Sequence, residues 1–519
     1  MKILVPFWDL LSGLRRGCRI RGVLMIYRRK ENSMSAWKCF WRLAPILIST
    51  SAALAAFTPL RVDVSGERPN IDILAKDPNR IRFEVRLPGV EFSRALLDGK
   101  FWDRVEIPGG SHDAQIGSPE IPSLTRLLAI PATARVHADF EIAESTVIPD
   151  VVLCPAQPDD PESLTLNAHA VEYNPAFYSE NDFFPRQNVI VGDPAVMRGV
   201  RLVPIRMNPV QYNPITKELR IIHRFRVTVR FEGEDLRNIP TRSIPLAAAR
   251  PKMMESSLIN HDDLEVDQTS AGSYLVVCVN DATLLNNIQP MLEWKRRKGH
   301  QVVVQTFSAG ATTTTIKNII QSAYNTWEVP PEYVLLIGDT SGSYTLAGWS
   351  PSGVDHPYSQ LDGSDILADV AVGRLPVENA TETTVMVNKV LFYEKMPYVT
   401  NADWFHQSVL TAGSGSGTST IQTNRWIKTR MVWNNYTRID TMWYTMGGSI
   451  PTTITNAINN GVSIFNYRGY WGISGWDNAD IDALTNGRKL PFCSVITCGT
   501  GGFDGDSNME HFLSVGTPT

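Results

Sequence analysis

The chain has 519 residues, of which 43% are hydrophobic and 20% charged, and its formal net charge is -4 at pH 7. This composition excludes a largely disordered chain and leaves room for two or three domains with full cores. The slightly acidic balance offers no basic surface, so we expect no nucleic-acid partner. Six cysteines show neither the density of a disulfide scaffold nor the C-x-x-C spacing of a zinc site.

The N-terminal residues carry the layout of a secretory signal. After Met34, the basic residues Lys38 and Arg42 precede an apolar stretch, residues 43–56, that ends in small side chains. The stretch is too short for a comfortable membrane span. We therefore expect translation to start at Met34, residues 1–56 to be an extension and signal peptide, and the rest to be secreted or on the cell surface, with no stable membrane span once the signal is removed. An uncleaved N-terminal anchor is the competing interpretation.

Residues 57–231 contain many short alternating segments separated by proline, glycine and asparagine, which predicts an all-β domain, a sandwich. The clearest strand is 225–231, where Phe and Val alternate with Arg and Thr. It follows residues 210–212 and a turn at Pro214, so the two runs predict a hairpin. Further strands are expected at 81–87, 127–130, 134–142 and 189–191. The domain holds no concentrated set of titratable groups, so we expect no catalytic role for it.

Residues 232–270 are polar, charged and proline-bearing, which predicts a linker. The basic residues Arg237, Arg242 and Arg250 lie within it. Exposed arginines would suit proteolytic processing, although basic residues are common in any linker.

From residue 271 onward, apolar strands alternate with helices, which predicts a mostly parallel sheet covered by helices on both faces. We interpret this stretch as one α/β domain in two parts, 271–397 and 398–519. The expected strands are 274–279, 301–306, 333–337, 408–412, 461–467 and 492–497, and the expected helices are 284–298, 313–327, 383–394, 420–433 and 454–459. Functional loops should cluster at the carboxyl ends of these strands.

Cys498 is the most informative residue of this region. It ends the last apolar run and is followed at once by glycine-rich chain, which is how an α/β protein presents a nucleophilic sulfur at the edge of its sheet. A small buried thiol at a strand end is the alternative. The strand 461–467 also opens into a glycine-rich loop, so two strand ends face one cleft. Cys493, five residues earlier, is better explained as a core thiol.

The loop of residues 355–374 concentrates charged side chains. It holds Asp355, His356, Asp362, Asp365 and Asp369. Such a set could bind a cation, position a catalytic histidine or recognise a basic substrate. Capping of turns is the alternative interpretation.

Several segments together resemble the gingipain-type cysteine peptidases, a branch of the caspase-like peptidases. They are residues 274–339, 355–374, 466–469 and 484–499, and the preceding β region resembles the propeptide of that family, for example at residues 117–122. The resemblance covers roughly residues 60–519. It implies a caspase-like fold and an exported bacterial endopeptidase made with a pro-domain, which in the best-known members cuts after basic residues. It implies no required cofactor, with a structural calcium ion as an option.

The resemblance also assigns roles to particular residues. Cys498 matches the nucleophile, Asp355 the acid that orients the catalytic histidine, and Asp365 the acid that receives a basic substrate side chain. The backbone N–H groups of Gly469 and Cys498 would stabilise the oxyanion. The family histidine is expected in a Tyr-x-Gly-His-Gly motif, but this chain places Tyr470 and then Trp471 after Gly469.

The missing histidine leaves the catalytic base open. A free cysteine has a pKa of about 8.5, so a peptidase normally relies on an imidazole to raise the thiolate fraction and to protonate the leaving amine. Tyr470 is a poor substitute, because a tyrosine has a pKa of about 10. His356 and His511 are candidate alternative bases, and each could instead be an ordinary surface or helix residue.

Three functions therefore stand. The first is an exported cysteine endopeptidase that hydrolyses protein or peptide substrates through the Cys498 thiolate. The second is a catalytically silent relative that binds peptides or other proteins at the cell surface. The third is a nucleotide-binding enzyme using the glycine-rich loop 413–417, which contains neither G-x-G-x-x-G nor a Walker lysine. Because the family continues beyond the position that matches Thr519, we also expect the chain to be part of a longer protein.

Overall fold

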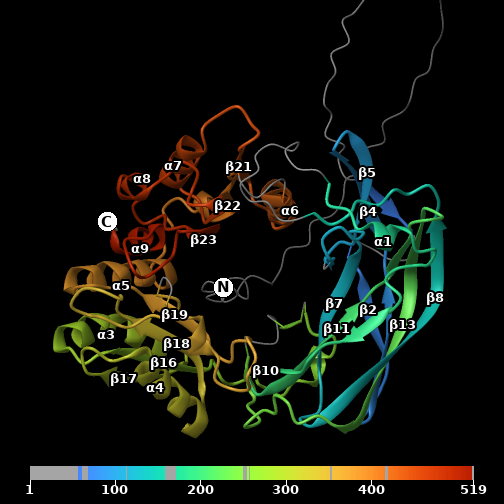
Figure 1. Cartoon of the computed structure of the whole chain (residues 1–519). Helices are drawn as coiled ribbons and strands as arrows, with labels where there is room; N and C mark the ends of the chain where they lie inside the picture. The colour runs from blue at the N-terminus through green and yellow to red at the C-terminus, as the bar shows by residue number, and fades with distance from the viewer. Residues whose placement is uncertain are drawn as a thin grey trace, which may run out of the picture.

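The computed structural model describes residues 56–60, 68–112, 114–157, 171–248, 254–255, 257–350, 353–414 and 419–516. The expected extension and signal peptide, apart from residue 56, lie outside the described residues. In the part of the chain that is described, no helix has the length and apolar character needed to cross a membrane. A β-rich region at one side of the molecule is followed along the chain by an α/β region at the other (Figure 1).

The N-terminal region consists of antiparallel strands in three sheets. One sheet has the order β1-β4-β5; a second has β10-β11-β7-β6 with β9 paired to β11; a third has β12-β13-β3-β2 with β8 paired to β13. The elements are β1 (Ala56–Pro59), β2 (Asn70–Asp77), β3 (Arg80–Arg86), β4 (Gly89–Leu97), β5 (Lys100–Glu106), β6 (Ser111–His112), β7 (Pro122–Ala129), β8 (Ala134–Ile148), α1 (Pro175–Tyr178), β9 (Val189–Val191), β10 (Ala195–Met197), β11 (Val200–Met207), β12 (Val210–Asn213) and β13 (Glu218–Glu234).

The two larger sheets share one hydrophobic core. Phe83 and Val227 from one sheet and Leu128 and Ile205 from the other belong to a single buried cluster. Along β13 the apolar residues are buried while the arginines between them are only partly covered, which is the period of two seen in the sequence. The expected hairpin is confirmed, since β12 pairs antiparallel with β13. The alternation of apolar and polar residues therefore correctly predicted that this region is rich in β-strands with one buried face.

The segment expected to be a linker packs against both regions. Two short strands within it, β14 (Leu246–Ala247) and β15 (Val266–Asp267), pair in parallel, and a 3-10 turn, η1 (His261–Asp263), lies between them. The Leu127 N–H donates to the carbonyl of Ser257 at 2.8 Å. On the other side, the Arg242 guanidinium donates to the carbonyl of Trp327 at 2.9 Å, just beyond the end of α4. The polar residues of this segment therefore form hydrogen bonds to both the N-terminal and the C-terminal region.

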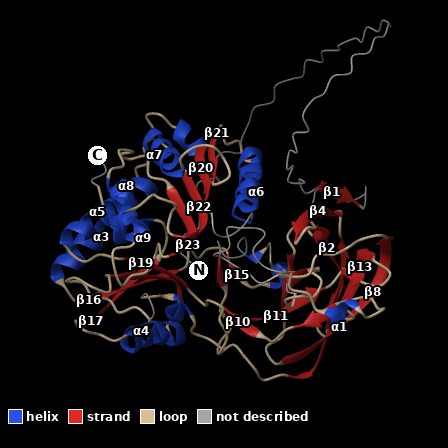
Figure 2. Cartoon of the chain, turned by 45° about the horizontal axis from the view of Figure 1, so that its top comes forward, coloured by secondary structure: helices blue, strands red, loops and turns tan. Residues whose placement is uncertain are grey.

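The C-terminal region contains two four-stranded sheets in which every pairing is parallel, with the orders β17-β16-β18-β19 and β21-β20-β22-β23. Figure 2 shows helices flanking both sheets. The elements are β16 (Ser273–Val279), α3 (Ala282–Arg297), β17 (Gln301–Phe307), α4 (Thr313–Thr326), β18 (Pro331–Ile337), η2 (His356–Ser359), β19 (Ala371–Leu375), α5 (Ala380–Glu394), η3 (Asp403–His406), β20 (Gln407–Ala412), α6 (Ser419–Trp433), β21 (Arg438–Trp443), α7 (Ile450–Asn460), β22 (Ile464–Trp471), α8 (Asn478–Asp482), β23 (Phe492–Cys498) and α9 (Asn508–Ser514).

Helices cover both faces of the second sheet, as the purely apolar strands indicated. Val409 of β20 packs in the cluster that includes α7, whereas its neighbour Leu410 packs in the cluster that includes α6. Successive strand residues point to opposite faces, so each face of this sheet needs its own helix. The strands β19 and β21 were not predicted from the sequence. Strand β19 lies in a stretch that was interpreted as loop, and in β21 polar residues interrupt the apolar run.

Candidate active site

Cys498 is the last residue of β23, and its side chain is exposed. Gly499 follows with φ of 73°, a conformation that favours glycine, and a Cβ there would lie 2.9 Å from the indole of Trp471. The chain therefore turns sharply beside an aromatic ring directly after the cysteine. Cys493 on the same strand is partly buried, and burial raises the pKa of its thiol to about 12. The two cysteines thus differ as the sequence indicated.

A β-bulge lies beside Cys498 on the neighbouring strand. Trp471 of β22 pairs with Cys498, while Arg468 pairs with Ile496, so Gly469 and Tyr470 together face a single residue of β23. Bulges of this kind bend a strand and re-aim its side chains, and they are common next to active sites. Strand β22 continues four residues beyond its expected end at residue 467, because the bulge lets the pairing resume.

Gly469 is required by its surroundings as well as by its expected role at the oxyanion. A Cβ at this position would lie 2.4 Å from the hydroxyl oxygen of Tyr467. Tyr467 is 1% exposed, and its hydroxyl lies 2.9 Å from the Ser474 hydroxyl, so the ring has no room to move away. The same hydroxyl lies against Gly413, whereas most of the loop 413–417 falls outside the described residues.

Asp355 lies near the cysteine loop but is bonded to a buried arginine. The Arg374 Nε donates to Asp355 Oδ2 at 2.8 Å, and Nη2 donates to Oδ1 at 2.6 Å. The Arg374 side chain is 0% exposed, and its guanidinium lies 4.8 Å from the ring centre of Phe503, five residues after Cys498. Arg374 thus joins the acidic loop of the first sheet to the cysteine loop of the second.

Both candidate histidines contact groups other than Cys498. The Nε2 of His356 lies 2.9 Å from the carbonyl of Ile366, and its Nδ1 lies 3.4 Å from the Ser359 hydroxyl, so both ring nitrogens are engaged within their own loop. The Nδ1 of His511 lies 2.7 Å from Asp482, which pairs α9 with α8. Among the described residues, no contact joins either histidine to Cys498.

Asp365 is in contact with the N-terminal region. Its Oδ2 accepts a hydrogen bond from the Val196 N–H of β10 at 2.8 Å, and its Oδ1 accepts one from Leu367 N–H at 2.8 Å. In this conformation the carboxylate expected to receive a basic side chain receives backbone N–H groups instead. Strand β10 of the N-terminal region therefore covers this carboxylate.

A second carboxylate of the same loop, Asp369, anchors this contact. It is fully buried and accepts hydrogen bonds from the N–H groups of Leu361, Asp362 and Arg198, at 2.7, 2.8 and 3.0 Å. Burial raises the pKa of Asp369 to about 6. The turn between β10 and β11, which contains Arg198, is thereby held against the acidic loop.

The Arg198 side chain extends the contact into the interior of the α/β region. Its guanidinium lies 2.9 Å from the carboxylate of Glu332, and the two side chains are 4% and 0% exposed. It also donates to the carbonyl oxygens of Pro330 and Pro331. No sequence pattern indicated this pair, because its members are 134 residues apart and neither lies in a recognisable motif.

A buried pair of carboxyl groups joins the two sheets. Asp339, after β18, and Glu510, on α9, are 6% and 9% exposed, and the two groups interact directly. Burial is the first cause that raises the pKa of Glu510 to about 7, and the Asp339 charge adds to it. Among the described residues, Asp339 Oδ1 and Glu510 Oε1 have no hydrogen-bond donor. In the sequence Asp339 is recognisable as the end of a predicted strand, whereas no motif or spacing marks Glu510.

Comparisons with known proteins bear on this arrangement. The model of peptidase family C25 matches residues 267–516, and the model of the C25 propeptide matches residues 63–243. Gingipain R2 of Porphyromonas gingivalis is 24% identical over 486 residues, which cover 90% of this chain and 65% of that protein. Lys-gingipain W83 of the same organism is 28% identical over 448 residues, which cover 80% of this chain and 25% of that protein.

Among solved structures, that of the Arg-specific cysteine proteinase gingipain R is 23% identical, covers 48% of this chain and 60% of that chain, and has a TM-score of 0.43. The chain spans 45% of gingipain R1 and 65% of gingipain R2, so it corresponds to only part of these relatives.

Proposed function

Because the chain belongs to the gingipain-type cysteine peptidases of family C25 and carries the propeptide of that family, we propose that it is an exported cysteine endopeptidase that cuts polypeptides through Cys498. The observation that supports this most directly is the exposed sulfur at the end of β23, beside the bulge at Gly469. Parallel strands with helices on both faces and loops at their carboxyl ends support a caspase-like arrangement. The basic and apolar residues after Met34 support export.

In the proposed reaction the Cys498 thiolate attacks the carbonyl carbon of the scissile bond. The negative charge that develops on the carbonyl oxygen is stabilised by the N–H groups of Gly469 and Cys498. Loss of the amine gives a thioester, which water hydrolyses to release the acid and the free thiol. Asp365 selects a basic side chain before the cut, as in the arginine- and lysine-directed relatives.

The N-terminal region keeps this site closed in the proposed scheme. Substrate selection by Asp365 requires that Val196 of β10 leave the carboxylate. We therefore assign the described conformation to a latent form, in which the propeptide is still bound. Removal of the propeptide would expose Asp365 and the acidic loop.

The end of β22 also supports a second function, that of a catalytically silent relative that binds peptides. Tyr470 stands where the family motif expects histidine, and both oxygens of Asp355 are bonded to Arg374. Neither His356 nor His511 is hydrogen-bonded to Cys498 in the described part of the chain, so the proton transfers of the proposed reaction lack their usual carrier there.

One experiment separates these functions. The chain, freed of its propeptide by limited proteolysis, is incubated with peptides that carry arginine, lysine or alanine before the cut, and the Cys498→Ser variant is the matched control. Cleavage after a basic residue that disappears in the variant supports the endopeptidase. Absence of cleavage, together with the slow and alkali-dependent iodoacetamide labelling of an ordinary thiol, would establish the silent relative.

We also propose a structural calcium ion between the two sheets. Asp339 and Glu510 supply buried carboxylate oxygens without donors, and calcium prefers carboxylate oxygens. Among the described residues no group of three or more acidic, histidine or cysteine side chains gathers around a metal position, so carbonyl oxygens or water would have to supply the other ligands. A bound cation would neutralise two charges that otherwise repel each other. Its proposed role is to hold α9 against the end of β18.

A further inference from the structure

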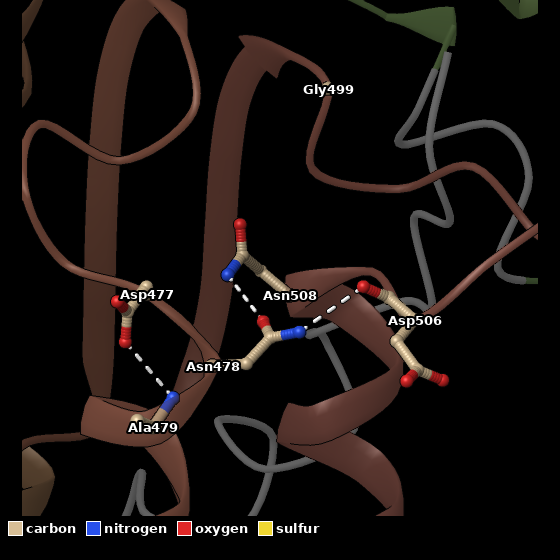
Figure 3. Close-up of a pocket in the computed structure, with 6 residues that line it drawn as sticks. All are labelled: Asp477, Asn478, Ala479, Gly499, Asp506 and Asn508. Atoms are coloured by element: carbon tan, nitrogen blue, oxygen red, sulfur yellow. Dashed lines mark hydrogen bonds between the residues drawn. The ribbon is translucent and has the colours of Figure 1, made fainter.

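A shallow, open polar pocket of about 420 Å³ lies next to the residue that follows the candidate nucleophile. Its wall includes Gly499, the residue after Cys498, together with the beginnings of α8 and α9 (Figure 3). The lining residues are Asp477, Asn478, Ala479, Gly499, Asp506 and Asn508. No spacing of residues in the sequence predicted this pocket, because α8 and α9 are separated by β23 along the chain.

The walls of the pocket are held by their own hydrogen bonds. The Asn508 amide donates to Asn478 Oδ1 at 2.6 Å, and the Asn478 amide donates to the carbonyl of Asp506 at 3.1 Å. The Asp477 carboxylate accepts from Ala479 N–H at 3.0 Å and caps α8. Figure 3 shows these bonds on the side of the pocket opposite Gly499. The pocket is therefore formed before any ligand arrives, which lowers the cost of binding.

The charge of the pocket is negative. Two of its six lining residues are acidic, two are amides and none is basic. A third carboxylate, that of Asp480, accepts a hydrogen bond from the Asp477 N–H at 2.9 Å and adds to the local charge. Walls of one sign around a concave site concentrate ligands of the opposite sign.

The pocket lies on a different side of the nucleophile from Asp365. Asp365 contacts β10, and β10 lies on the opposite side of β23 from α8 and α9 in both views of the molecule (Figures 1 and 2). A polypeptide that ran from Asp365 past Cys498 toward Gly499 would bring the residue after the cut to the pocket.

We propose that this pocket binds the substrate residue on the leaving-group side of the scissile bond and that it accepts a lysine or arginine side chain. The inference rests on the proposed function, since it takes Cys498 as the point of attack. The long side chain of lysine or arginine fits the available volume, and its N–H donors match the carboxylate, amide and carbonyl oxygens of the wall. An acidic side chain would be repelled.

The test uses binding, so that it does not depend on catalysis. The full chain with Cys498→Ala is titrated with acetylated peptides that represent only the leaving-group fragment, beginning with lysine, alanine or glutamate and carrying a neutral dye at the far end. These peptides do not need access to Asp365. We expect the lysine peptide to bind about tenfold more tightly than the glutamate peptide at low salt, with the preference falling as salt is added.

Matched variants assign the preference to the pocket. Asp477→Asn keeps a good helix cap while removing one charge, and Asp506→Asn removes the other. The two substitutions together should abolish the preference for lysine. Asp504→Asn, which removes an exposed carboxylate of the same loop outside the lining, should leave the preference intact.

The outcomes separate the inference from the proposed function. Equal affinity for the lysine and glutamate peptides, an unchanged preference in the double variant, or no binding of any peptide would each overturn the inference. A lysine preference that the double variant abolishes supports it, even if the active-site assay finds no hydrolysis. In that case only the proposed chemistry fails, and the pocket belongs to a peptide-binding protein.

Discussion

The guanidinium of Arg374 bonds both carboxylate oxygens of Asp355, through Nε at 2.8 Å and Nη2 at 2.6 Å. The same guanidinium donates through Nη1 to the carbonyls of Gly338 and Leu346, at 2.8 and 2.9 Å. Asp355 is therefore the counter-charge of an arginine that holds the ends of two strands and the loop between them. Because both oxygens of the Asp355 carboxylate are bonded to Arg374, its main effect in this conformation is to stabilise the fold around the site.

This relationship predicts the effect of Asp355→Asn. The substitution leaves the fully buried Arg374 charge without its carboxylate, so the free energy of unfolding should fall by about 3 kcal/mol or more. Denaturant unfolding measures it, and Asp504→Asn, an exposed loop carboxylate, is the control. Because replacing both charged partners removes the unpaired charge, Asp355→Leu with Arg374→Met should cost less than Asp355→Asn alone. Full stability of Asp355→Asn with loss of cleavage only would instead identify a purely catalytic role.

If position 470 corresponds to the histidine of the family motif, as proposed above, a histidine placed there should raise the activity. In Tyr470→His an imidazole would lie on the bulge beside Cys498, and general acid-base catalysis is typically worth about 100-fold or more in rate. We expect the rate of peptide cleavage by the propeptide-free chain to rise by about 100-fold. The rate should also become dependent on pH near the pKa of histidine. Tyr470→Phe should produce no rise. An unchanged rate in Tyr470→His would show that position 470 does not reach the reacting sulfur.

Secondary structure could be predicted from the sequence wherever a local pattern of apolar residues determines a single strand or helix. The alternation of β13 and the apolar runs of β16, β18 and β20 each correspond to a strand of the expected type. The strand β21 was missed because its polar residues at positions 438, 440 and 441 break the apolar run. The end of β22 was placed too early because pairing through a bulge leaves no mark in hydrophobicity.

The candidate site could be predicted from the sequence only in part, for a different physical reason. Cys498 and Gly469 stand out because a strand that ends in glycines has a local signature. The partners of Asp355, Asp365 and Asp369 come from Arg374, Val196 and Arg198, and such pairings depend on how distant segments pack. No local pattern encodes them. The contacts that the linker makes with both regions left no signal for the same reason, since a polar segment bonded to two surfaces has the composition of a free one.

The buried pair of Arg198 and Glu332 predicts how firmly the propeptide region is held. Arg198→Met removes the cation beside a carboxylate that is 0% exposed, so we expect a loss of about 3 to 5 kcal/mol in the stability of the contact between the two regions. Hydrogen exchange of β10 and of the loop 361–369 would report the loss as faster exchange. Arg198→Met with Glu332→Leu should recover part of the protection. Unchanged exchange in Arg198→Met would contradict the anchoring role.

The carboxyl pair between the sheets predicts a pH dependence of stability. The pKa of Glu510 in the folded chain is about 7, above its ordinary value, so its contribution to stability is fully present below the ordinary pKa and is lost as the pH rises through 7. The free energy of unfolding should therefore fall by up to about 3 kcal/mol across this range. Asp369 acts in the same direction, but its pKa of about 6 is lower, so of these two carboxyl groups Glu510 accounts for most of the change above pH 6.

Glu510→Gln tests this assignment, because it keeps the shape of the side chain and removes its titration. The variant should lose most of the fall in stability between pH 6 and 8 and also the Glu510 share of the fall below pH 6, and it should keep the share that Asp369 contributes. Calcium added at pH 8 should raise the melting temperature of the parent chain, since an ion that binds only the folded state stabilises it, and should have little effect on Glu510→Gln. A parent chain whose stability is flat from pH 6 to 8 without calcium would remove the basis for both the shared carboxyl pair and the ion.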